Sequence, residues 1–240
     1  MLASPVHARL AALATGYELP PAAAGQLATV LELVAAEPTS ITTVRDPALA
    51  VDVHVADSLT GLELDAVRGA LRVADLGSGG GFPGLALAAA LPEARFALVE
   101  SVGKKCAFLR RAAEAAGLGN VDVVQARAES WPAGIGAHDL VTARALAPLP
   151  VLVEYAAPLL EVGGALVAWK GRRDPAEERD GAAAAQQLGM DPPAAHPVEG
   201  PRRGEERHLY LSSKVMETPP GYPRREGIAR KRPIRASGGR

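Results

Sequence analysis

The stretch VADLGSGGGFPG, residues 73–84, joins a short apolar run to a loop that holds five glycines and one proline. Glycine allows a backbone to turn tightly and to approach a ligand closely. Pro83 suits the first turn of the following segment, PGLALAAAL, because the N–H that proline lacks has no partner there in any helix. The stretch therefore predicts a strand, a ligand-binding loop and a helix in direct succession.

The same alternation of strands and helices continues along the chain. A helical stretch at 102–117 has one apolar stripe, made of Val102, Cys106, Leu109, Ala113 and Ala116. Further apolar residues at helical spacing near positions 27–34 and 51–62 predict a small helical layer before the first strand. The expected strands are LRVADL (71–76), ARFALVE (94–100), VDVVQA (121–126), HDLVTA (138–143), GGALVAWK (163–170) and RHLYLSS (207–213). This order favours an α/β fold with a parallel sheet, helices on both faces and ligands at the carboxyl ends of the strands.

Length and composition are those of a globular protein with a full core. The chain has 240 residues, of which 48% are hydrophobic and 22% charged. Its one cysteine excludes an internal disulfide and a cysteine-based zinc cluster, and we expect no metal. No stretch approaches the roughly 20 apolar residues of a membrane helix, and the first residues lack a secretory core. We therefore expect a cytoplasmic protein that does not associate with membranes.

Charge divides the chain into three parts. Residues 1–62, the expected helical extension, carry two arginines against six acids, and residues 63–216, the expected α/β domain, are nearly balanced. Residues 217–240 carry seven basic residues against two glutamates and have little apolar periodicity. Such a composition predicts an extended, flexible arm, which either attracts a polyanion or is simply solvated.

The residues around the glycine loop indicate the kind of cofactor. The segment GGGFPG formally satisfies a dinucleotide motif, but counted from Gly77 the third motif position is Phe82, which is too large for close strand–helix packing. Asp75 would disfavour a pyrophosphate and suit a cationic ligand, whereas Glu100 ends the next strand, where an acid commonly binds ribose hydroxyls. Together with Gly77 and Gly79, these acids favour S-adenosyl-L-methionine over a nicotinamide cofactor.

A family resemblance rests on longer segments. The run DLGSGGGFPGLALAAALPEARFALVESVGKKCAFLRRAAEAAGLGNVDVVQARAE is followed by DLVTARALA, GGALVAWKG, GEERHLYL and YPRREG. Over roughly residues 40–234 the chain resembles the RsmG (GidB) family of S-adenosylmethionine-dependent 16S rRNA guanine-N7 methyltransferases. The resemblance implies a Rossmann-like class I methyltransferase sheet with a helical N-terminal extension. It also implies 16S rRNA or the small ribosomal subunit as substrate, and we expect a monomer.

The resemblance carries cofactor-binding positions onto five residues of this chain. Gly77 and Phe82 lie in the glycine loop, Ala128 and Glu129 follow the third strand near the expected adenine, and Arg144 follows the fourth strand, where the methyl donor meets its acceptor. Guanine N7 has an in-plane lone pair and needs no general base, so catalysis reduces mainly to orientation. Arg144 is the candidate catalytic residue, for positioning or for countering charge on the guanine; it could also form an ion pair with Glu129 or Asp139.

Other polar residues have two interpretations each. His54 and Asp57, one helical turn apart, could reach over the site or form a surface pair. Lys170 could contact a phosphate. A basic group on the helical stretch could grip phosphates or be a solvated face; its members are Lys104, Lys105, Arg110 and Arg111.

Two other classes of function share part of this pattern. A nicotinamide-dependent oxidoreductase would have the same alternation, but Asp75, Phe82 and the lack of a substrate domain disfavour it. A non-catalytic RNA-binding or ribosome-assembly factor would share the basic C-terminal segment, but would not need the glycine loop with its two acids. Cofactor binding distinguishes all three.

Overall fold

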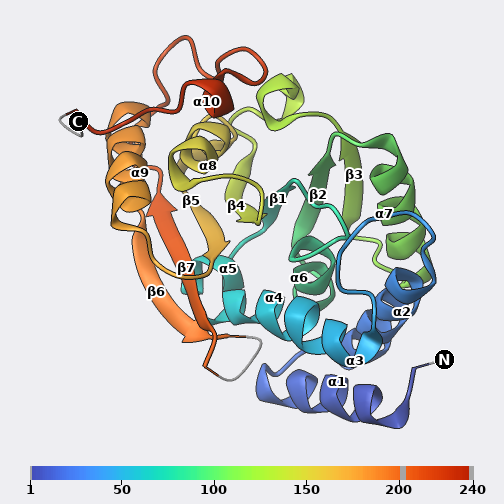
Figure 1. Ribbon diagram of the computed structural model, residues 1–240. Coiled ribbons are helices and arrows are strands. Elements are labelled where there is room, and N and C mark those ends of the chain that lie inside the picture. The colour runs from blue at the N-terminus through green and yellow to red at the C-terminus, as the bar shows by residue number, and fades with distance from the viewer. Residues whose placement is uncertain (1, 201–203, 238–240) are drawn as a thin grey trace.

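The computed structural model describes residues 2–200 and 204–237, and folds them around one seven-stranded sheet with helices on both faces (Figure 1). The strand order is β3-β2-β1-β4-β5-β7-β6. The strands are β1 (Arg72–Leu76), β2 (Arg95–Glu100), β3 (Val121–Gln125), β4 (His138–Arg144), β5 (Leu160–Lys170), β6 (Ala194–Glu199) and β7 (Glu206–Ser213). All six strands expected from the sequence are present.

The sheet is mixed rather than parallel throughout, which corrects the expectation. Strands β1 to β5 are parallel, whereas β7 runs antiparallel to β5, and β6 runs antiparallel to β7. Only a short connection separates β6 from β7, and neighbouring strands joined in this way are antiparallel. The sequence did not reveal β6, whose segment AAHPVE contains Pro197; proline is tolerated because β6 is an edge strand.

Two apolar cores fill the space between the sheet and its helices. Alternate residues of one strand point into different cores: Val73 lies in the first, whereas Ala74 and Leu76 lie in the second. The first core includes residues of α1, α2, α6 and α7, and the second includes residues of α8 and α9. The longer helices are α1 (Ser4–Gly16), α2 (Ala23–Ala36), α6 (Gly84–Ala90), α7 (Gly103–Ala115), α8 (Leu149–Ala156) and α9 (Pro175–Leu188). Within the described residues, no helix is both long and apolar enough to cross a membrane.

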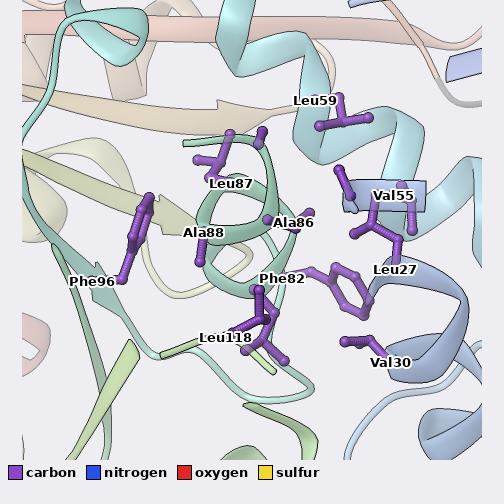
Figure 2. Packing of buried hydrophobic residues seen from close by; sticks show 14 of the residues in the cluster. Leu27, Val30, Val55, Leu59, Phe82, Ala86, Leu87, Ala88, Phe96 and Leu118 are labelled. Atoms are coloured by element: carbon purple, nitrogen blue, oxygen red, sulfur yellow. The ribbon is translucent and has the colours of Figure 1, made fainter. Parts of the chain in front are cut away.

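The N-terminal helical layer exists, and it shares a core with the sheet. Residues 47–68 form a chain of short elements, namely α3 (Pro47–Ala50), a π-helical turn (Val51–Ala56), α4 (Asp57–Leu59), a 3₁₀ turn (Thr60–Glu63) and α5 (Asp65–Arg68). Figure 2 shows Phe82 of the glycine loop beside Leu27 and Val30 of α2 and Val55 of the π-helical turn. Phe82 therefore anchors the glycine loop to the N-terminal layer; the division at residue 62 stays a prediction.

The C-terminal segment corrects a second expectation, because its described part packs on the fold instead of extending from it. Arg224 forms an ion pair with the buried Glu154 of α8. The short helix α10 (Ile228–Lys231) lies near α8 in Figure 1, and Ala229 is buried in the second core. Composition did not predict this packing because the contacts are mostly charged and backbone groups rather than an apolar stripe. Residues 238–240 lie outside the described residues.

Candidate functional site

The site lies where the order of the sheet reverses. Strands β2 and β3 continue on one side of β1, and β4 returns on the other, so the loops that follow β1 and β4 diverge and leave a crevice. Two neighbouring cavities occupy this edge of the sheet, and both are lined by Gly77, Lys105 and Ala145. We call them the β2–β3 cavity, of about 340 Å³, and the β4–β5 cavity, of about 530 Å³.

Glu100 supplies a fixed carboxylate to the β2–β3 cavity. It ends β2, and the N–H groups of Gly79 (3.1 Å) and Val102 (2.8 Å) donate to its two oxygens. Gly77 has a φ of +67°, and a Cβ there would lie 2.6 Å from Leu146 Cδ1. The glycine loop therefore folds against the Glu100 carboxylate, and a larger residue at position 77 would displace Leu146, which also lines this cavity.

The far wall of the β2–β3 cavity follows β3. Ala128 and Glu129 begin a 3₁₀ turn after β3, where the sequence placed them, and line the cavity. Tyr155 of α8 and Arg230 of α10 line it as well. Burial raises the pKa of Tyr155, and the neighbouring Glu129 carboxylate adds to the shift, so the phenol stays protonated at neutral pH.

The β4–β5 cavity is cationic. It is bordered by the ends of β4 and β5, the start of β7, the π-helical turn and residues 41–43. The described residues that line it include no aspartate or glutamate. Its charged lining side chains are Lys105, Arg144, Lys170 and Arg207. Such a lining suits an anionic ligand.

A buried aspartate holds two of these cations. The Asp57 side chain is 0% exposed, and its carboxylate lies 2.7 Å from Arg144 Nη1 and 2.5 Å from Arg207 Nε. Arg144 also donates to the carbonyl oxygen of Val53 (3.1 Å). Asp57 is thus neither at the rim of the site nor part of a surface pair, and it replaces Glu129 and Asp139 as the expected ion-pair partner of Arg144.

His54 joins Arg144 to the glycine loop. Its ring stacks on Phe82 with centroids 4.9 Å apart, and its Nδ1 lies 3.3 Å from Arg144 Nη2. Its Nε2 lies 3.0 Å from the Val44 carbonyl oxygen and 3.1 Å from Thr42 Oγ1. Burial lowers the pKa of His54, and the Arg144 charge lowers it further. The neutral tautomer with a proton on Nε2 therefore fits: it donates to Val44 and accepts from Arg144.

Asp75 does not take the place expected for it. Its side chain is fully buried, it accepts a hydrogen bond from Thr142 Oγ1 (2.8 Å), and the described linings of the two cavities do not include it. Burial raises its pKa to about 6. A Cβ at Gly84 would lie 2.7 Å from its Oδ2, so Asp75 packs beneath the start of α6.

The remaining predicted residues divide between the cavities and the surface. Phe82, Gly79 and Arg144 line only the β4–β5 cavity. Among the basic residues of α7, Lys105 lines both cavities, whereas Arg111 pairs with the buried Glu37. Lys170 lines the β4–β5 cavity and pairs with Glu177 of α9 (2.6 Å).

Several site residues were not found from the sequence. Arg207 is the second residue of β7, a strand that was expected, but an arginine near a strand end is ordinary. Tyr155 lies within an apolar helix, and Arg230 belongs to the segment that was expected to be extended. These residues meet only because distant segments pack together, and no local spacing signals that.

The architecture and the cleft define a class of protein. The fold is similar to that of the S-adenosylmethionine-dependent methyltransferase SibL (TM-score 0.57, 17% identity, 67% of this chain and 55% of that chain). It also resembles the cofactor-bound Rv0187 from MTB (TM-score 0.51, 21% identity, 81% and 90%). The chain thus has the fold of a class I S-adenosylmethionine-dependent methyltransferase.

Sequence comparison then gives the family. Residues 26–210 match the model of the GidB family, rRNA small subunit methyltransferase G. The chain is 48% identical over 200 residues to ribosomal RNA small subunit methyltransferase G of Rubrobacter xylanophilus (81% of this chain, 77% of that protein) and 42% identical over 199 residues to that of Deinococcus deserti (82% and 80%). The chain belongs to the rRNA small subunit methyltransferase G family, an S-adenosylmethionine-dependent family, as the motifs predicted.

Proposed function

We propose that this protein transfers the methyl group of S-adenosylmethionine to N7 of a guanine in a loop of 16S rRNA. The adenosyl group occupies the β2–β3 cavity and the guanine occupies the β4–β5 cavity. The observation that carries the proposal is that the two cavities meet at Gly77, and that Glu100 and Glu129 line the β2–β3 cavity whereas the described lining of the β4–β5 cavity has no acid. The protein acts in the cytoplasm, as a monomer, on rRNA of the small subunit.

The β2–β3 cavity suits an adenosyl group. The Glu100 carboxylate, fixed by two backbone N–H groups, accepts from ribose hydroxyls. The Ala128 backbone and the Glu129 side chain face the adenine edge, with one donor and one acceptor, respectively. The cofactor supplies an electrophilic methyl group on a sulfonium centre.

The β4–β5 cavity suits a nucleotide. Its four cations offer partners for phosphate oxygens, and the His54–Phe82 pair and Trp169 contribute aromatic surface near Arg144. A base in a loop is the easiest to turn out of its stack into such a cavity. Arg144 is fixed by Asp57, Val53 and His54 before the substrate arrives, so little order is lost when it contacts the guanine.

The absence of an acid from the described lining fits N7 chemistry. The N7 lone pair forms the new N–C bond as the C–S bond breaks, and no proton leaves the nucleophile. The guanine ring gains positive charge in this step, and the cationic guanidinium of Arg144 does not stabilise that charge. The role of Arg144 is therefore to position the base, by donating a hydrogen bond to the O6 acceptor beside N7.

Two measurements test the proposal. Calorimetry should show micromolar or tighter binding of S-adenosylmethionine or S-adenosylhomocysteine and no binding of NAD. Mass mapping of 16S rRNA from cells lacking the protein should show one guanine without its methyl group, which returns on complementation. A fully methylated 16S rRNA in those cells would contradict the substrate assignment, and a preference for NAD would contradict the cofactor site.

A further inference from the structure

The C-terminal segment, residues 222–232, is attached to the fold at points next to the β2–β3 cavity. Arg224 Nε lies 2.6 Å from Oε1 of Glu154, whose side chain is 2% exposed, and Arg224 Nη2 donates to the carbonyl oxygen of Arg232 (3.0 Å). Ala229 is 3% exposed in the second core. An ion pair to a buried glutamate and one buried alanine side chain thus attach the segment to the fold at two points.

The same segment reaches the residues that line the cavity. The N–H of Gly227 donates to Oε1 of Glu129 (3.0 Å), and Arg230 Nη2 donates to the carbonyl oxygen of Leu146 (2.9 Å). Glu129, Leu146 and Arg230 itself all line the β2–β3 cavity. The cavity wall is therefore incomplete without the C-terminal segment.

We propose that residues 222–232 form part of the cofactor site, and that their docking positions Glu129 for the adenine edge. The Gly227 N–H engages one oxygen of the Glu129 carboxylate, which fixes its rotamer and leaves the other oxygen to accept from the adenine amino group. Arg230 closes the cavity beside Tyr155. This inference rests on the proposed placement of the adenosyl group.

Docking of the segment and cofactor binding are therefore coupled in both directions. A cofactor that contacts the ordered wall stabilises the docked segment. The factor by which the cofactor favours docking is the factor by which loss of docking weakens cofactor binding. If this segment were an extended arm, truncation would remove only an RNA-binding element. Because the segment is docked, truncation would remove part of the methyl-donor site.

The test changes docking at a residue that does not itself line the cavity. Arg224→Ala removes the ion pair with Glu154, and Arg225→Ala is the matched control because that neighbouring side chain is exposed. We expect S-adenosylhomocysteine, measured by calorimetry, to bind about ten-fold more weakly to Arg224→Ala and almost unchanged to Arg225→Ala. The Michaelis constant for the methyl donor should rise with little change in turnover number, a split that general loss of stability would not produce.

Amide hydrogen exchange measures the same coupling and does not require an activity assay. The amide of Gly227 should exchange faster in Arg224→Ala than in the unchanged protein, and S-adenosylhomocysteine should slow its exchange in the unchanged protein. Arg230→Ala, at an exposed position, gives a second variant that should fold normally and bind S-adenosylhomocysteine about five-fold more weakly.

The outcomes separate this inference from the proposed cofactor site. If Glu100→Gln weakens S-adenosylhomocysteine binding but Arg224→Ala and Arg230→Ala do not, the adenosyl placement stands and the role of the C-terminal segment is refuted. If Glu100→Gln has no effect either, the adenosyl group lies elsewhere and both fail. Faster exchange at Gly227 in Arg224→Ala with unchanged affinity would also refute the coupling.

Discussion

The two cavities at the edge of the sheet are built in different ways. The β2–β3 cavity is lined largely by segments that follow consecutive strands, and it contains both acids, Glu100 and Glu129, and bases, Lys105, Arg127 and Arg230. The β4–β5 cavity gathers the π-helical turn, the ends of β4 and β5 and the start of β7, and its charged lining groups are cations. The β2–β3 cavity depends mainly on local sequence, and distant segments add only Tyr155 and Arg230 to it, whereas the β4–β5 cavity depends on long-range packing.

This difference shows how the fold separates its two tasks. A constant cofactor can be bound by a short loop whose geometry is set by glycines and one neighbouring strand. An RNA substrate needs cations held apart from acids, and here a buried carboxylate on the N-terminal layer, Asp57, holds Arg144 and Arg207 from the back. The N-terminal layer therefore borders the β4–β5 cavity, the proposed substrate side of the site.

The largest effect is expected from Asp57→Ala, which should disrupt the β4–β5 cavity and leave the β2–β3 cavity intact. The change leaves Arg144 and Arg207 without their carboxylate, and loss of one partner of a buried ion pair costs about 3–5 kcal/mol. Urea unfolding should show this loss and methylation should stop, whereas the folded fraction should still bind S-adenosylhomocysteine. Equal loss of cofactor binding by the folded fraction would mean that the cavities are not independent.

Gly77→Val should damage both cavities, since Gly77 lines both. Its Cβ would collide with Leu146, and we expect no measurable cofactor binding. Gly117→Val is the matched control, because Gly117 has a similar φ of +65° but open space around its Cβ position. Both variants carry backbone strain of roughly 1–2 kcal/mol. Normal cofactor binding by Gly77→Val in calorimetry would show that the loop is misplaced.

Arg144→Ala tests whether the substrate side does more than hold the fold together. Asp57 keeps its ion pair with Arg207 in this variant, so the melting temperature should fall only slightly. Turnover should fall further, by about ten-fold to a hundred-fold, because a positioned donor is lost. Arg144→Lys, which keeps the charge without the planar fork, is the control. Matched losses of stability and turnover would reduce Arg144 to a structural residue.

The comparison also explains what the sequence could predict. The glycine loop, Glu100 and the order of strands are local patterns, so spacing predicted the α/β fold and suggested the proposed cofactor side, to which the family motifs added Ala128 and Glu129. The place of Asp57 required knowing that the π-helical turn packs over β4, which no spacing reveals. The contact between Arg224 and Glu154 could not be predicted from the sequence for the same reason, because the two residues are 70 positions apart.

The smallest expected effect is the dependence of stability and turnover on pH. Two buried histidines, His54 and His138, are expected to cause it. His54 lines the substrate side, whereas His138 begins β4 at the opposite edge, and burial lowers the pKa of both. A histidine whose native pKa is lowered binds fewer protons in the folded than in the unfolded chain. Each therefore contributes stability that is fully present above about pH 6.5 and is lost as the pH falls toward the lowered pKa.

Only one of these two losses should reach the activity. Protonation gives His54 Nδ1 a hydrogen that faces the Arg144 guanidinium, so one of the three acceptors that hold Arg144 is lost. The Asp57 carboxylate raises the pKa of His54 and so offsets part of the lowering by burial and by Arg144. His54→Asn keeps an acceptor near that position without titrating, and should flatten the acid limb of the turnover profile. His138→Asn should flatten the acid limb of the stability curve, measured by urea unfolding, but leave the turnover profile unchanged. If both variants changed turnover alike, the acid loss of activity would reflect unfolding, and His54 would have no separate role in holding Arg144.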